Sequence, residues 1–223
     1  MFRSLISGAE VNIAEGGFSD RSITACISGH RDIPADRDMP CSTASAKLLI
    51  EHYIDCAVRE GYRVFISGLA EGTDLWAADY IVRISGAVRD IKLVGVMPCL
   101  RHAERFSQES RRCLARAERA AFRLYTTCDE ANAVYSAKQA KYRDIYRSRN
   151  YFMVDNSSAL LGFYDPGLKS RSGTGQTVRY AQKKHLDIHT YDCTDIFGIE
   201  SMSGGDRAEA GRILSESRYF RYL

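Results

Sequence analysis

The chain has 223 residues, of which 45% are hydrophobic and 26% are charged, a composition that excludes disordered and fibrous classes. Its 31 Lys and Arg residues and 28 Asp and Glu residues give a net charge of +3, which is too small to indicate nucleic-acid binding by itself. No run of 18 apolar residues is present, so we expect no membrane-spanning helix and no membrane partner.

Short apolar runs alternate with segments of helical periodicity along most of the chain. Strands that alternate with helices predict an α/β fold, a doubly wound parallel sheet with helices on both faces in three layers. The expected elements are strands at 23–28, 62–67, 91–97, 122–126, 158–164 and 187–191, and helices at 42–59, 73–84, 104–120, 130–155 and 175–184.

One domain, at residues 22–192, accounts for this alternation. Residues 1–21 are polar and glycine-bearing and are expected to form a loose N-terminal arm, whereas residues 193–223 form a C-terminal extension with a short helix around 206–217. Near-continuous apolar runs are typical of strands buried on both faces. They predict central positions in the sheet for the strands at 23–28, 62–67, 91–97 and 158–164.

The most informative segment is Val64-Phe-Ile-Ser-Gly-Leu-Ala-Glu-Gly-Thr-Asp-Leu-Trp-Ala-Ala-Asp79. An apolar run ends at Gly68, a short loop passes through Gly72, and a helix opens at Thr73 and Asp74. Such a junction directs unpaired backbone N–H groups at one point and favours an anion there. An ordinary βα turn that uses glycines for its geometry is the alternative interpretation.

Two further junctions have the same character. The strand at 23–28 is followed by Gly29, His30 and Arg31, and the strand at 158–164 leads to Gly173-Thr-Gly-Gln-Thr177 before the next helix. Carboxyl ends of parallel strands meet at one edge of a sheet, where ligands bind. We therefore expect one pocket for a phosphorylated or nucleotide-like ligand, with a phosphate at Gly173–Thr177 and a helix that begins within two residues of Gly175. None of these loops matches a Walker loop or the full dinucleotide fingerprint.

Polar side chains near these junctions could contact such a ligand. Arg31 could pair with a phosphate, and Asp74 could accept a hydrogen bond from a sugar hydroxyl or stabilise the dipole of its own helix. Asn150 and Asp155 could reach a ribose or a base edge, or could be a capping amide and a solvated carboxylate. Glu71 is a candidate general base, although a phosphate would repel it.

Basic residues are concentrated in two expected helices, from Arg111 to Arg119 and from Lys138 to Arg149. They alternate with acids and alanines, so we favour solvated faces over a nucleic-acid surface, and a nucleic-acid partner is not expected. A homo-oligomer remains open.

The seven cysteines are scattered and form no C-x-x-C pair, and the five histidines lack metal-ligand spacing. We expect free thiols, no metal site and, because Met1 to Asp20 lack a signal-peptide pattern, a cytoplasmic protein.

Taken together, four motifs resemble those of the YpsA family, which belongs to the SLOG superfamily of Rossmann-like proteins. That superfamily also holds the DNA-processing protein DprA and the LOG cytokinin-activating phosphoribohydrolases. The resemblance runs from about residue 23 to residue 191. In chain order the motifs are Ile27-Ser-Gly-His-Arg31, Ser67-Gly-Leu-Ala-Glu-Gly-Thr-Asp-Leu-Trp-Ala-Ala-Asp79, Arg149-Asn-Tyr-Phe-Met-Val-Asp155 with Tyr164-Asp165, and Ser172-Gly-Thr-Gly-Gln-Thr-Val-Arg-Tyr-Ala181.

The resemblance implies a Rossmann-like fold with a nucleotide pocket. The catalytic glutamate that LOG enzymes carry after their Pro-Gly-Gly-x-Gly-Thr loop is absent here, because Val178, Arg179 and Tyr180 supply no carboxylate. Carried over by position, the ligand-binding candidates are Gly29, His30, Arg31, Gly68, Gly72, Asp74, Asn150, Asp155, Gly173, Thr174 and Thr177.

Three functions fit these features. The first is a sensor or binding protein for a nucleotide or an ADP-ribose-like derivative. The second is a nucleotide N-glycosidase of the LOG type that uses Glu71 or Asp155 as its acid or base. The third is single-stranded DNA binding of the DprA type, which the modest net charge disfavours. No cofactor other than a nucleotide-derived ligand is expected.

Overall fold

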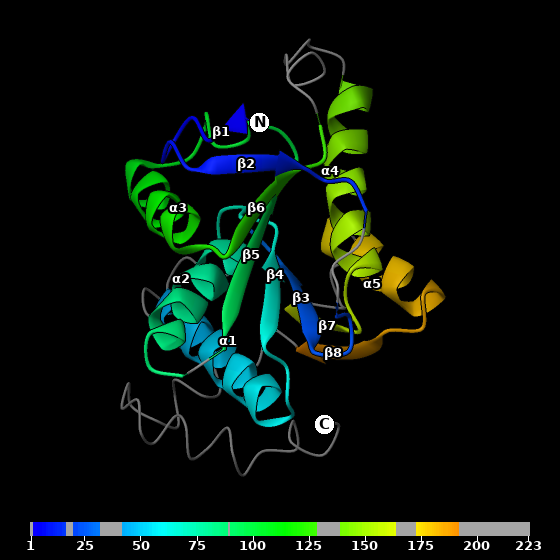
Figure 1. Ribbon diagram of the computed structural model, residues 1–223. Helices are drawn as coiled ribbons and strands as arrows, with labels where there is room; N and C mark the ends of the chain where they lie inside the picture. Colours follow the sequence, from blue (N-terminus) through cyan, green and yellow to red (C-terminus); the bar gives the residue numbers. More distant parts are fainter. Residues whose placement is uncertain are drawn as a thin grey trace.

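A computed structural model describes residues 2–16, 20–31, 42–88, 90–128, 139–163 and 173–191. At its centre lies an eight-stranded sheet with the order β1-β2-β6-β5-β4-β3-β7-β8 (Figure 1). β1 is antiparallel to β2, and all the other neighbouring pairs are parallel. The strands are β1 (Phe2–Arg3), β2 (Glu10–Ile13), β3 (Thr24–Gly29), β4 (Val64–Ser67), β5 (Lys92–Met97), β6 (Arg123–Thr126), β7 (Ala159–Phe163) and β8 (Asp187–Tyr191).

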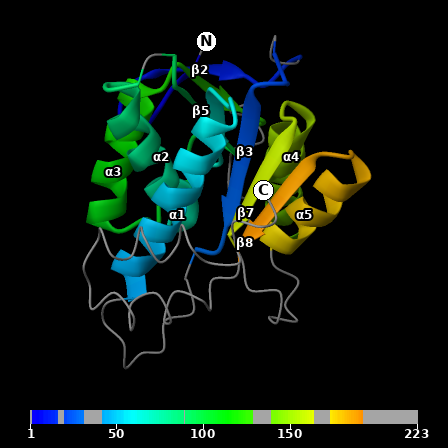
Figure 2. The ribbon, with the colours of Figure 1, turned by 90° about the horizontal axis from the view of Figure 1, so that it is seen from below.

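Helices cover both faces of this sheet (Figure 2). One face carries α1, α2 and α3, and the other carries α4 and α5, which confirms the predicted three-layer, doubly wound α/β fold. Each layer has its own apolar cluster, the larger one under α1 to α3 and the smaller one under α4 and α5. The helices are α1 (Ser42–Arg59), α2 (Thr73–Ser85), α3 (Gln108–Ala120), α4 (Gln139–Asp155) and α5 (Gly173–Lys183).

The four strands predicted to be central are β3, β4, β5 and β7, and each has a parallel neighbour on both sides. β7 is buried along its whole length and β5 is buried beyond its first residue, as near-continuous apolar runs require. The chain runs outward from β3 through β4 and β5 to β6, and then returns to place β7 on the other side of β3. The carboxyl ends of β3 and β7 therefore form the topological switch point at which open α/β sheets bind ligands.

Helix boundaries follow local capping chemistry. α3 begins at Gln108 rather than at residue 104, because the Ser107 side chain accepts a hydrogen bond from the Ser110 N–H at 3.1 Å and caps the helix. α5 begins at Gly173, which confirms a start within two residues of Gly175. Residues 130–138, residues 164–172 and the C-terminal extension, including its expected helix, lie outside the described residues.

The expectation of a loose N-terminal arm is wrong for residues 2–13. β2 pairs with β6 in parallel register, with Asn12 opposite Tyr125, and Val11 is fully buried. The Ser4 hydroxyl donates a 2.6 Å hydrogen bond to the buried Glu118 carboxylate on α3. The segment therefore extends the sheet by two strands and packs against α3.

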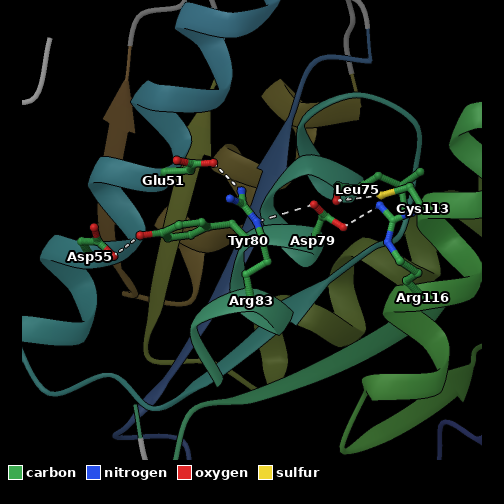
Figure 3. A network of polar contacts seen from close by, with 8 residues as sticks. All are labelled: Glu51, Asp55, Leu75, Asp79, Tyr80, Arg83, Cys113 and Arg116. Carbon is green, nitrogen blue, oxygen red and sulfur yellow. Dashed lines mark hydrogen bonds and ion pairs between the residues drawn. The ribbon is translucent and has the colours of Figure 1, made fainter. Parts of the chain in front are cut away.

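Ion pairs connect the helices of the larger layer (Figure 3). On α2, Arg83 pairs with Glu51 of α1, and Asp79 pairs with Arg116 of α3 at 2.9 Å. Tyr80 adds a 2.6 Å hydrogen bond to Asp55 of α1. These contacts connect α2 to both of its neighbours on the solvent side.

Among the described helices, none combines the length and apolar character needed to cross a bilayer.

Candidate functional site

The β4–α2 junction is a buried, tightly folded loop at the carboxyl edge of the sheet. The Ser67 hydroxyl donates to the Asp74 carbonyl at 2.8 Å and accepts from the Leu69 N–H at 3.1 Å. Gly72 has a φ of +83°, and the buried Leu69 has a φ of +53°, a region that a non-glycine residue rarely adopts. Backbone conformations of this kind are maintained by surrounding packing and occur often at functional sites.

The ends of β3 and β7 are joined to the start of α2. Thr73 donates from its N–H at 3.3 Å and from its hydroxyl at 3.0 Å to the His30 carbonyl. The His30 N–H donates to the Phe163 carbonyl at 3.2 Å. A Cβ at Gly29 would overlap the Thr73 side chain, and one at Gly72 would overlap the Arg31 carbonyl. Glycine at these two positions therefore allows the junctions to approach each other this closely.

A buried ion pair crosses the same edge. Arg149, on α4, extends its guanidinium over Gly68 to the Asp74 carboxylate on α2, with Nη1 and Oδ2 3.4 Å apart. A Cβ at Gly68 would overlap that guanidinium. Only 6% of the Arg149 side chain and 7% of the Asp74 side chain are exposed. The pair thus connects the two helical layers across the end of the sheet.

Burial determines the electrostatics of this pair. Burial raises the pKa of Asp74, and the Arg149 charge opposes that rise. Burial lowers the pKa of Arg149, and Asp74 opposes that fall. The Arg149 Nε–H is buried and has no hydrogen-bond acceptor among the described residues. One strong donor at the edge is therefore unsatisfied within the described structure.

Two arginines share one aromatic ring at this edge. The guanidinium carbons of Arg31 and Arg149 lie 5.3 Å and 5.6 Å from the centroid of the Tyr146 ring. Arg31 is exposed, and its charge also lowers the pKa of Arg149. Like charges this close favour an anion beside them.

The N-terminus of α5 lies next to Asn150. A Cβ at Gly173 would lie 3.9 Å from the Asn150 amide nitrogen, so the two residues are close neighbours. Thr174 and Thr177 are buried, and the Thr177 hydroxyl donates to the Gly173 carbonyl at 2.9 Å. That bond stabilises the first turn of α5, whose initial N–H groups have no partner within the helix.

Comparison with known proteins agrees with this architecture. The YpsA family model, described as the YspA SLOG family, matches residues 36–196, more than half of the chain. The chain belongs to this family. The UPF0398 proteins of Bacillus thuringiensis (strain Al Hakam) and Bacillus cereus (strain Q1) are 30% identical to it over 130 residues, which cover 57% of this chain and 63% of each relative. The UPF0398 protein of Macrococcus caseolyticus (strain JCSC5402) is 27% identical over 123 residues, or 53% of this chain and 60% of the relative. The chain thus spans less than two thirds of the length of these relatives.

Most of the site residues predicted from the YpsA motifs come together at one edge. These are Gly29, His30, Arg31, Gly68, Gly72, Asp74, Asn150, Gly173 and Thr174, while Thr177 lies one turn into α5. Within the described part of the chain, no group of three or more His, Cys, Asp or Glu side chains could hold a metal ion. The cysteines at positions 26, 56, 99, 113 and 128 are free thiols, and Cys41 and Cys193 lie outside the described residues.

The structure does not bring Asp155 to this group. Asp155 ends α4 and pairs with Lys184 at 2.8 Å and with the Tyr180 hydroxyl at 3.1 Å, just before β7 begins. It therefore lies at the amino edge of the sheet, opposite the other candidates. Glu71 is in the β4–α2 loop, but its carboxylate accepts a 2.9 Å hydrogen bond from the Ser107 N–H before α3. A structural role accounts for both carboxylates.

Three further residues at the carboxyl edge of the sheet were not predicted from the sequence as site residues. Arg149 belongs to a quoted motif but was not predicted to reach Asp74, and Tyr146 gave no signal in the sequence. His102 is also buried; its Nδ1 lies 3.0 Å from the Cys99 carbonyl, while Nε2 has no hydrogen-bond partner among the described residues. Burial lowers the pKa of His102 to about 4, so the ring is neutral at pH 7.

Proposed function

We propose that the chain binds a nucleotide or a nucleotide derivative such as ADP-ribose, at the carboxyl edge of β3, β4 and β7. The observation that supports this most strongly is that two consecutive residues of α4 contact two different glycine junctions. Arg149 contacts the β4–α2 junction over Gly68, and Asn150 lies beside Gly173 at the start of α5. These two contacts place the β4–α2 junction and the start of α5 close to each other at the switch point of the sheet.

Each part of this edge suits one part of such a ligand. The first turn of α5 and the Arg31 guanidinium favour a phosphate, since the N-terminal N–H groups of a helix, its dipole and a cation all attract anions. The Asn150 amide, next to Gly173, suits the hydroxyls of a ribose or the edge of a base. Gly173 lets the ligand approach the backbone closely.

The residues at this edge favour ligand binding without a chemical reaction. An N-glycosidase needs a carboxylate that is available to the sugar. Glu71 holds the Ser107 N–H, and Asp155 lies at the opposite edge. Asp74 lies at the edge, but its carboxylate is paired with Arg149. We therefore expect a sensor or binding protein of the YpsA type.

A matched pair of glycine substitutions tests this proposal. Gly173→Ala has room within the protein, but it places a methyl group where a phosphate would approach the backbone. Gly86→Ala is the control, because its Cβ would also meet nothing closer than 3.8 Å, at the far end of α2. Calorimetric titration with ADP-ribose, ADP and AMP should show binding to the wild type and to Gly86→Ala. Gly173→Ala should bind roughly tenfold more weakly or worse, a loss of about 1.4 kcal/mol.

Two other outcomes are informative. If the wild type binds none of the three compounds, and its melting temperature is unchanged at millimolar ligand, the proposal is wrong. A saturating ligand, at about 100 times its Kd, should add roughly 2.7 kcal/mol of stability. Release of free base during incubation would instead support the N-glycosidase.

A further inference from the structure

Positive charge is concentrated in one segment of the chain. Residues 101–123 hold seven arginines and three glutamates, an excess of four positive charges, whereas the whole chain has an excess of three. The remainder of the chain is therefore slightly negative. This segment includes α3 and the residues directly before and after it.

The structure shows that all of these arginines are exposed and that three of them share one face of α3. All seven arginines are exposed, at positions 101, 105, 111, 112, 116, 119 and 123. Glu118 is only 2% exposed and lies against Ser4, so it points away from that surface. In the sequence, acidic residues alternate with these arginines, and this favoured a solvated face. In the structure, Glu118 is turned away from the arginines and does not offset their charge at the surface. We call the outward face of α3 that carries Arg112, Arg116 and Arg119 the α3 basic face. α3 is the helix at the left margin of its layer in Figure 2.

Contacts within the described residues leave much of this charge uncompensated. Arg101 pairs with Glu104 at 3.6 Å, Arg116 pairs with Asp79 at 2.9 Å, and Arg111 donates to the Glu104 carbonyl. In the described part of the chain, Arg105, Arg112 and Arg119 form no ion pair. Unpaired guanidinium groups are suited to bidentate contacts with phosphate.

Three of the arginines are aligned along the axis of α3. Arg112, Arg116 and Arg119 occur at i, i+4 and i+7 on α3, so they form one row along the helix. The 13 residues of α3 extend for about 20 Å at 1.5 Å per residue. Phe122 follows directly, is 50% exposed, and lies beside Arg123 and Lys92, whose charged groups are 4.8 Å and 4.6 Å from its ring centroid. A row of three arginines, with an exposed aromatic residue two positions beyond the end of the helix, resembles the surfaces that bind single strands by backbone contact and stacking.

We propose that the α3 basic face binds single-stranded nucleic acid. An anionic membrane suits this face less well, because an interfacial helix needs an apolar face free for lipid and α3 buries its apolar side, including Leu114 and Ala117, in the core. The proposal is independent of the nucleotide site, since the row of arginines lies on the flank of the helical layer and not at the switch point.

A charge-matched pair of double variants tests the proposal. Arg112→Gln with Arg119→Gln removes two unpaired charges from the face and breaks no described ion pair. Arg179→Gln with Lys183→Gln removes the same charge from exposed positions on α5, in the other layer, and also breaks no described ion pair. Binding of a fluorescein-labelled oligothymidylate is followed by anisotropy between about 50 and 200 mM salt, with a duplex of equal length and polyglutamate as competitors.

We expect wild-type affinity to fall linearly with log salt, with a slope of about 0.7 per phosphate contact for a single strand. The α3 double variant should bind roughly tenfold more weakly at low salt, with a slope lower by about 1.4. The control variant should change affinity less than twofold. Equal losses in both variants, equal binding of the duplex, stronger competition by polyglutamate, or no binding by the wild type would each overturn the proposal.

Discussion

At the scale of single residues, the site depends on the buried pair of Arg149 and Asp74. The two residues are 75 positions apart, and nothing in the sequence identifies them as partners. Gly68 is a stronger signal, because a glycine directly after a buried strand indicates a close approach of some group. The sequence could predict that space is needed there, but not that a guanidinium from the other helical layer fills it.

Asp74→Asn should destabilise the protein by about 3–5 kcal/mol, because it leaves the buried Arg149 charge without a counter-charge. Urea unfolding measures this difference. Asp144→Asn is the matched control on α4, where the Arg147–Asp144 pair at 2.8 Å is exposed, and it should change stability by less than about 0.5 kcal/mol. Equal effects of the two substitutions would show that the Asp74 pair is not buried.

The effect of Glu118→Gln on the free energy of unfolding should depend on pH, with the variant gaining stability relative to wild type as pH rises. Burial raises the pKa of Glu118, although the Ser4 hydrogen bond opposes this. A carboxyl group with a raised folded pKa stabilises the fold below its usual pKa, and this contribution is lost as pH rises through the folded value. Glutamine keeps an acceptor for Ser4 and does not ionise. The stability of the variant relative to wild type, measured by urea unfolding from about pH 4.5 to 7.5, should therefore increase with pH; a constant difference would contradict the shift.

At the scale of elements, most strands and helices could be predicted because buried parallel strands and amphipathic helices have distinct periods. β2 could not be predicted, since it has four residues and only Val11 is buried. The position of Asp155 was also beyond the sequence. Asp155 lies six residues beyond Arg149, about 9 Å along α4, and which of them approaches the ligand edge depends on how far the helix extends past the sheet.

The inclusion of the N-terminal segment in the sheet can be tested within β2 itself. Val11→Ala removes methyl groups from a fully buried side chain and should destabilise the protein by roughly 1–3 kcal/mol. Ile13→Ala, at a position that is 43% exposed, should change stability by less than about 0.5 kcal/mol. Thermal unfolding of both variants measures the contrast. Similar, small effects would indicate that β2 does not pack on the core.

At the scale of the whole molecule, the fold separates two surfaces. The carboxyl edge of the sheet holds three glycine junctions and two arginines around one switch point. The α3 basic face belongs to α3, which lies in the larger helical layer (Figures 1 and 2). The amino edge holds the Asp155–Lys184 pair and has a structural role. A nucleotide at the first surface and a polyanion at the second could therefore bind independently.

The central claim, a nucleotide site at the carboxyl edge, is tested most directly by amide chemical-shift mapping during titration with ADP-ribose. The account predicts that the largest shifts occur at Gly29–Arg31, Gly68–Asp74 and Gly173–Thr174, which the fold brings to that edge. Shifts confined to the amino edge around Asp155 and Tyr180, or to α3, would contradict it.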